Sequence, residues 1–224
     1  MNLCSKLRIL GIALVLTTAV ASADTLQISS FATGHDVGAD NTATAFAGSP
    51  STTYSLNPHP PVWHDAIGSS EWVSYNAETG PGGSVTSPNG TYTYTTTFSL
   101  DTTNETYIGF LNVLADDTTD VYLNGQLVRG VDLSGNDNHC QEHQPNCLEP
   151  LQVTLNSAFF VNGQNTLSFA VHQTGGADQG LDFDGLVTGA QRQGTSQTPE
   201  PGTLLLLGTG LVGSAGMLFR RMRA

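Results

Sequence analysis

Residues 91–100 have the sequence TYTYTTTFSL, in which tyrosine, phenylalanine and leucine mostly occupy every second position. In an extended chain, successive side chains point to opposite faces, so the larger side chains share one face and the hydroxyl side chains share the other. A period of two is typical of strands with one buried face, whereas helices have a period near 3.6 residues. The stretch therefore predicts a half-buried β-strand.

The sequence on both sides continues this pattern of short strands and tight turns. Residues 121–128, VYLNGQLV, place Asn-Gly between two short apolar segments. Asn-Gly accepts the positive φ angles of a two-residue hairpin turn, so this stretch predicts a β-hairpin. Further strand candidates are residues 107–115, 151–155, 158–161, 166–172 and 180–188. Without an amphipathic helix among them, these elements predict an all-β fold, an antiparallel β-sandwich or jelly roll.

Charge is distributed unevenly along the 224 residues. Residues 24–198 hold 18 of the 19 acidic side chains and only two of the seven Lys and Arg, Arg129 and Arg192. Nucleic acids and anionic lipids need clustered cations, so we expect no nucleic acid partner. A strongly negative body suits a soluble domain that repels its own copies.

The N-terminus has the features of a secretory signal peptide over residues 1–23. Lys6 and Arg8 precede an apolar run at 9–21, and Ala21 and Ala23 supply the small side chains that signal peptidase requires. The run is too short to cross a bilayer comfortably. We therefore expect cleavage before Asp24, with an uncleaved N-terminal anchor as the alternative.

A second apolar segment lies at the C-terminus. Residues 202–219 contain no charge and are just long enough for a single transmembrane helix. Arg220, Arg221 and Arg223 follow at once, which predicts a cytoplasmic end and an external body. A buried core helix is the alternative. The expected organisation is a signal peptide at 1–23, a β-sandwich domain at 24–189, a polar linker at 190–198 and a sorting segment at 199–224.

Pro199, Glu200 and Pro201, the apolar helix and the final arginines together closely resemble the PEP-CTERM sorting signal. The prolines keep this peptide extended just outside the membrane, where an enzyme can reach it. The resemblance implies processing by an exosortase-type enzyme in a Gram-negative bacterium that makes exopolysaccharide. It also implies an inner-membrane intermediate and a final place on the cell surface or in the extracellular matrix.

The body has a looser resemblance to the galactose-binding-like β-sandwich. It depends on the strand, acidic turn and hairpin of residues 115–125 and on the Gly-x-Asn turn into an apolar strand at 160–169. The resemblance covers residues 71–188 and implies the sandwich architecture. It transfers no sugar site, because such domains place ligands on variable loops.

Two cysteines, Cys140 and Cys147, remain after the predicted signal cleavage. An even number of cysteines in an exported chain predicts a disulfide, which here would close a short loop. His139 and His143 lie beside them, so a metal site formed by these four residues is the alternative.

Chemical motifs are scarce, and we expect no enzymatic activity. The chain has no nucleophile elbow, zinc-protease motif, phosphate-binding loop or dinucleotide fingerprint.

Asp116, Asp117 and Asp120 cluster at a turn and are candidate calcium ligands, with solvated turn residues as the alternative. Trp63, which follows two prolines, is a candidate exposed platform for a glycan. No other cofactor is expected.

These features lead to three hypotheses about function. The first is an exported protein of the cell surface or extracellular matrix with a structural or adhesive role. The second is a carbohydrate-binding module that acts on exopolysaccharide, and the third is a secreted hydrolase.

Overall fold

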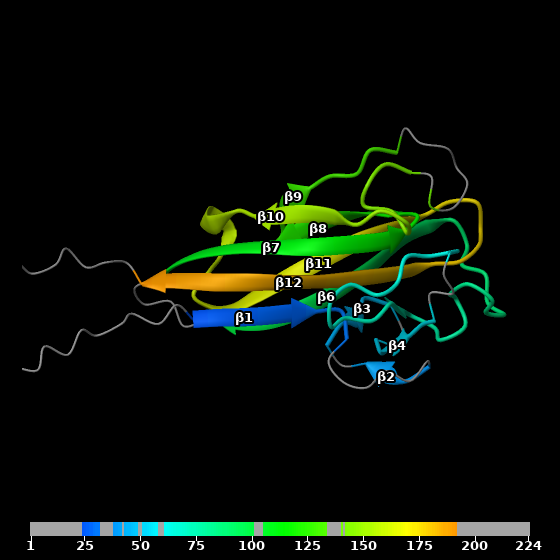
Figure 1. Cartoon of the computed structure of the whole chain (residues 1–224), viewed down its shortest axis with the longest axis horizontal. Helices are drawn as coiled ribbons and strands as arrows, with labels where there is room; N and C mark the ends of the chain where they lie inside the picture. The colour runs from blue at the N-terminus through cyan, green and yellow to red at the C-terminus, as the bar shows by residue number, and fades with distance from the viewer. Residues whose placement is uncertain are drawn as a thin grey trace, which may run out of the picture.

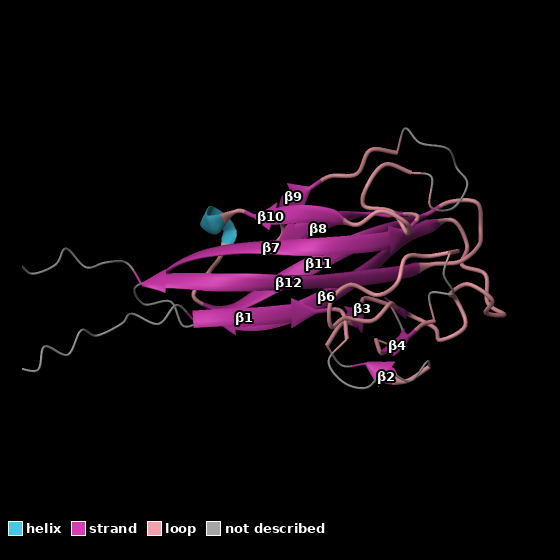
Figure 2. Ribbon diagram, viewed as in Figure 1, coloured by secondary structure: helices cyan, strands magenta, loops and turns pink. Residues whose placement is uncertain are grey.

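The computed structural model describes residues 24–31, 38–41, 43–48, 51–57, 61–100, 105–133, 140 and 142–191. These residues form strands and one short 3₁₀ helix (Figures 1 and 2). The elements are β1 (Asp24–Ser29), β2 (Asp40–Asn41), β3 (Ala45–Phe46), β4 (Thr53–Ser55), β5 (Val73–Ser74), β6 (Gly90–Leu100), β7 (Glu105–Asp116), β8 (Thr118–Leu123), β9 (Gln126–Arg129), β10 (Leu151–Leu155), η1 (Ser157–Phe159), β11 (Gly163–Gln173) and β12 (Gly180–Gln191).

Two antiparallel sheets make up the described body. The seven-stranded sheet has the order β10-β7-β12-β5-β4-β2, and β1 also pairs with β12. The five-stranded sheet has the order β3-β6-β11-β8-β9. The prediction of an all-β antiparallel fold is therefore confirmed.

Local sequence signals explain the long strands and the best-defined turn. Along β6, Tyr94, Phe98 and Leu100 are buried at alternate positions, as the period of two predicts. Asn124 and Gly125 connect β8 to β9 with φ angles of 51° and 77°, so the predicted hairpin is confirmed.

The main hydrophobic core fills the space between the sheets. Phe169 of β11 and Phe183 of β12 stack there, with ring centroids 4.4 Å apart. Both rings are fully buried, and burial of a side chain of this size stabilises a fold by about 1.5–3 kcal/mol. The inward residues of the two sheets thus hold the sandwich together.

The candidate strand at 158–161 is wrong. Its first part belongs to η1, which begins after Asn156, and the side chain of Asn156 accepts a hydrogen bond from the amide of Ala158. A capping side chain of this kind stabilises a helical turn over an extended chain.

Both ends of the chain lie outside the described residues. These include the processing and sorting residues Ala21, Ala23, Pro199, Glu200, Pro201, Arg220, Arg221 and Arg223, together with the predicted helix at 202–219. In the part that the structure describes, no helix has the length and apolarity needed to cross a membrane.

Candidate functional site

The outward side chains of β7 form one row that passes from solvent into a small second core. Ile108 and Phe110 are 65% and 40% exposed, whereas Leu114 and Asp116 are fully buried. Asn112 lies between the two pairs and is half-buried. Because alternate residues of a strand share a face, all five lie on the outer side of the seven-stranded sheet. One strand therefore connects a bare surface with a buried acidic cluster.

The bare half of this face is an apolar patch with a polar border, which we call the outer-face platform. Leu186 of β12 lies opposite Phe110, and Ile108 is the next outward residue of β7. Thr154 of β10 and Gln27 of β1 extend the same row on either side. The neighbouring row supplies polar groups from Gln152, Asn112, Asp184 and Ser29. Such a surface suits contact with another surface or a polymer.

An open groove of about 610 Å³ runs beside the platform, between β1 and β6. Its lining consists of Leu26, Gln27, Ile28, Ser29, Ala43, Ser69, Thr96, Thr97, Phe98 and Ser99, none of which carries a charge. Among the described residues, β1 pairs with β12 alone, and β6 beyond Thr95 pairs with β11 alone. Both strands thus turn a free edge toward this groove.

Gln27 belongs to both the platform and the groove. Its amide nitrogen donates to Asp184 Oδ1 at 2.7 Å and to Ser69 Oγ at 3.2 Å. These bonds hold the amide at the boundary between the apolar patch and the groove, where its oxygen can accept a hydrogen bond from a ligand.

The other half of the outer face is covered by loops that carry two tryptophans. Trp63 and Trp72 stack with ring centroids 4.2 Å apart, and both are buried together with Leu114 and Cys147. The expectation that Trp63 is exposed is wrong, because this side chain is only 1% exposed. Its ring lies against the backbone of β12, so it cannot offer a face to a glycan.

Asp182 is a buried carboxylate beneath these loops. It accepts hydrogen bonds from Ser70 Oγ at 2.5 Å, from the Ile67 amide at 2.8 Å and from Ser30 Oγ at 3.0 Å. Burial nevertheless raises the pKa of Asp182 to about 6, because desolvation of the charged form outweighs these bonds. The group holds the loops to β12.

The three candidate calcium ligands do not form one site. Asp116 and Asp117 are both buried at the end of β7, whereas Asp120 bonds to His172. Among the described residues, the only close group of three possible metal-binding side chains does not include Asp117 or Asp120. Calcium binding itself stays a prediction.

The Asp116 carboxyl lies in an unusual environment. Its Oδ2 accepts a hydrogen bond from Trp63 Nε1 at 2.7 Å, while its buried Oδ1 has no hydrogen-bond partner. Burial raises the pKa of Asp116 well above its usual range, and the adjacent Asp117 carboxyl raises it further, against a lowering effect of the indole. A proton is therefore held readily at this carboxyl.

A hydroxyl, an imidazole and a carboxylate line up on the outer face of the other sheet. His172 Nε2 lies 2.9 Å from Asp120 Oδ2, and His172 Nδ1 lies 3.3 Å from Thr91 Oγ1. These residues come from β11, β8 and β6, so strand pairing aligns them. Sequence reasoning missed the arrangement, because only the cross-strand register brings the three residues together.

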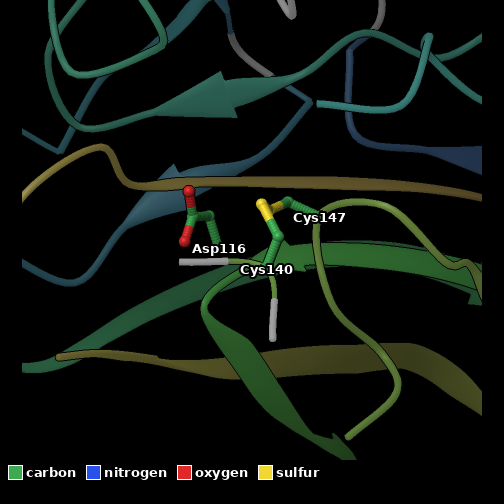
Figure 3. Close-up of side chains that lie close together, drawn as sticks. All are labelled: Asp116, Cys140 and Cys147. Carbon is green, nitrogen blue, oxygen red and sulfur yellow. A yellow bond between two sulfur atoms is a disulfide. The ribbon is translucent and has the colours of Figure 1, made fainter. Parts of the chain in front are cut away.

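The predicted disulfide between Cys140 and Cys147 is present (Figure 3). A carboxylate oxygen of Asp116 and the two sulfur atoms all lie within 4.8 Å of one another. Thiolates bind metals, whereas sulfur atoms in a disulfide do not, so the oxidised form lacks the cysteine ligands of the alternative metal site. His143 is exposed, with Nε2 3.9 Å from Asp132 Oδ2, and His139 lies outside the described residues.

Comparison with known families identifies the tail. Residues 197–223 match the PEP-CTERM protein-sorting motif, which confirms the resemblance noted in the sequence. The motif marks an exported protein that passes through the membrane and is processed by exosortase-type sorting machinery. No curated protein has a sequence that matches this chain significantly.

Several solved structures show a distant likeness to the body. A family 35 carbohydrate-binding module from Paenibacillus barcinonensis is 13% identical, with a TM-score of 0.33 over 73% of this chain and 97% of that module. The CBM36-1 domain of a xylanase from the hindgut metagenome of Trinervitermes trinervoides is 11% identical, with a TM-score of 0.30 over 75% and 98%. A family 35 module from Clostridium thermocellum is 10% identical, with a TM-score of 0.30 over 74% and 98%. Scores this low say nothing about a ligand.

Proposed function

We propose that this exported protein is a non-catalytic adhesive module on the surface or in the extracellular matrix of a Gram-negative bacterium. The observation that supports this function best is the exposure of Ile108 and Phe110 at 65% and 40% beside Leu186. Large apolar side chains grouped on one exposed face are typical of interaction surfaces. The flat platform offers contact area without the enclosed pocket that a small-molecule enzyme needs.

The position of the platform fits a tethered protein. Asp24 at the start of β1 pairs with Gly189 near the end of β12, so β1 begins and β12 ends at the same side of the body (Figure 1). Thr188, opposite Ile108, lies next to Gly189 in β12. A C-terminal tether that follows β12 would therefore begin close to the platform.

The test is the retention of the purified mature protein on insoluble matrix washed from the producing cells. Phe110→Ser and Ile108→Ser should each lower the bound fraction several-fold, because each removes apolar contact area. Leu127→Ser is the matched control, since Leu127 is 53% exposed but lies on β9 of the other sheet. Equal retention of all four proteins would reject the platform as the adhesive surface.

A second candidate function, binding of exopolysaccharide, is supported by the groove between β1 and β6. Its volume of about 610 Å³ is in the range of known ligand sites. Hydroxyl and amide groups alternate there with apolar side chains, a lining suited to sugar rings. Since the lining is uncharged and the body is strongly acidic, a neutral glycan fits the groove better than a polyuronate.

Thermal unfolding in the presence of polysaccharides tests this second function. A neutral exopolysaccharide should raise the melting temperature of the native protein, whereas a polyuronate should not. Gln27→Ala should abolish the rise, because it removes the amide at the mouth of the groove. Thr25→Ala, two residues earlier on the same face of β1 and outside the groove, should retain it. A melting temperature unchanged by neutral polymers would exclude the groove as a glycan site.

Processing can be tested separately from adhesion. The mass of the protein recovered from the producing cells should begin at Asp24 and end near Glu200. A full-length mass in the membrane fraction would instead show a permanent single-span anchor.

A further inference from the structure

The two sulfur atoms of the disulfide have different surroundings. Cys147 is fully buried with Trp63 and Trp72, whereas Cys140 is only partly buried at the edge of this cluster. Cys140 Sγ lies 3.6 Å from the carbonyl oxygen of Val62, a residue that is 52% exposed. A thiol in solution can therefore approach Cys140 but not Cys147.

A carboxyl group lies on the buried side of this disulfide. Asp116 lies beside the disulfide (Figure 3), and a carboxylate oxygen is within 4.8 Å of both sulfur atoms. The Oδ1 atom of Asp116 is buried and accepts no hydrogen bond from the loop. This group is well placed to exchange a proton with a sulfur atom beside it.

We propose that the Cys140–Cys147 disulfide is a site of thiol–disulfide exchange, in which an external dithiol attacks Cys140 and Asp116 protonates the sulfur that leaves from Cys147. This reactivity goes beyond the adhesive function and does not depend on it. The partner is any exported dithiol compound or protein that can reach the Cys140 side of the loop.

The exchange balances as two steps. A thiolate of the dithiol attacks Cys140 Sγ, the sulfur–sulfur electron pair passes to Cys147 Sγ, and that sulfur takes the proton from the Asp116 carboxyl. The second thiolate of the dithiol then attacks the other sulfur of the same dithiol, which is bonded to Cys140. This step closes a disulfide within the dithiol, and the released Cys140 sulfur takes a proton from water. Two electrons pass from the dithiol to the cysteine pair. In the reverse direction, the Asp116 carboxylate removes the proton from Cys147.

The leaving sulfur needs an internal proton donor because Cys147 is buried. A thiolate left at Cys147 would lie in an apolar cluster, where an unpaired charge is costly. Arg129 is the only Lys or Arg among the described residues, and its guanidinium donates to the Gln144 carbonyl at 3.3 Å. The pKa of Asp116, raised by burial and by Asp117, keeps a proton available for the leaving sulfur. A protonated leaving group departs more readily than a bare thiolate.

The test measures how fast dithiothreitol reduces the folded mature protein, with alkylation and mass spectrometry as the readout. Rates are divided by the concentration of dithiothreitol thiolate at each pH. The normalised rate of the native protein should fall as the pH rises and Asp116 loses its proton. Asp116→Asn should lower this rate by about tenfold or more at acidic pH and flatten the profile, since the amide has no proton to give. Asp40→Asn, a carboxylate change at an exposed position of β2, should follow the native profile.

Two outcomes would overturn the proposal. One is a normalised rate for the native protein that does not change with pH, a result that requires no variant to fold. The other is an Asp116→Asn protein that melts like the native one and is reduced at the same normalised rate. Either result would leave a disulfide with only a structural role.

Discussion

The indole nitrogen of Trp63 donates a 2.7 Å hydrogen bond to Oδ2 of Asp116, across 53 residues of sequence. Both side chains are almost completely buried, and Trp63 also stacks on Trp72. This bond attaches the loop that follows β4 to the end of β7 and closes one half of the outer face. It therefore separates the covered half of that face from the bare platform.

Trp63→Phe should destabilise the protein by about 3 kcal/mol, because it leaves a buried carboxyl without its donor and opens a cavity. Urea unfolding, which gives the free energy of unfolding, is the measurement. Val62→Ala changes the adjacent, half-exposed side chain and should alter stability by less than about 0.5 kcal/mol. A Trp63→Phe protein as stable as the control would show that the hydrogen bond contributes nothing net.

The strands could be predicted from the sequence, but the cover of the outer face could not. The alternation in residues 91–100 is local, and Asn124-Gly125 determines its own turn, so both were predictable. The burial of Trp63 depends on Gly180, more than a hundred residues away, whose missing side chain leaves room for the indole. No local sequence pattern shows that Trp63 and Gly180 come into contact.

The platform escaped prediction for a similar reason. Residues 107–115 are mostly apolar, which indicates a strand covered on both faces. β7 does lie between β10 and β12, but at Ile108 and Phe110 nothing in the described chain covers its outer side. Whether a loop covers a strand is a long-range property, so no local pattern shows that half of this row is bare.

Asp182 should make stability depend on pH. Its pKa is about 6 in the folded chain and near 3.8 when unfolded, so the folded state binds the proton more tightly. The resulting stabilisation is complete below pH 3.8 and is lost as the pH rises through about 6. The difference of about two units between the folded and unfolded pKa corresponds to about 3 kcal/mol in the free energy of unfolding.

The melting temperature should consequently rise as the pH falls from about 8 to about 5. Asp182→Asn should reduce this rise, since the amide cannot titrate. High salt screens the general repulsion among the surface carboxylates, so the effect of the buried group should persist there. A native protein whose stability falls over this range would contradict the expected sign.

Substitution of Asn165 should destabilise the fold more than substitution at most other polar positions. Its side chain is fully buried and makes four hydrogen bonds of 2.8–3.0 Å with Asn124, Val161 and Gly163. Asn165→Ala should cost about 3 kcal/mol or more in chemical unfolding, because several buried groups lose their partners together. Asn162→Ala, at an exposed position in the same turn, should cost less than about 0.5 kcal/mol. Similar losses of unfolding free energy at both positions would mean that the buried hydrogen-bond network does not stabilise the fold.

Gly180 should tolerate no side chain while Trp63 is present. A Cβ at this position would lie 2.7 Å and 2.9 Å from two atoms of the Trp63 ring and 3.1 Å from Trp72. Gly180→Ala should therefore destabilise the protein by about 1–3 kcal/mol through overpacking. Gly90→Ala is the matched control, because a Cβ there meets nothing within 4 Å, and it should be nearly neutral.

Combining the two changes tests whether Trp63 is the cause. In a Trp63→Phe background the shorter ring leaves room for a methyl group, so Gly180→Ala should cost less than it does in the native protein. The difference is a coupling energy of about 1 kcal/mol or more in a double-mutant cycle measured by urea unfolding. Additive losses would instead place the strain in the backbone of β12 or at Trp72, and the contact between Trp63 and Gly180 would not be what fits the covering loop to the sheet.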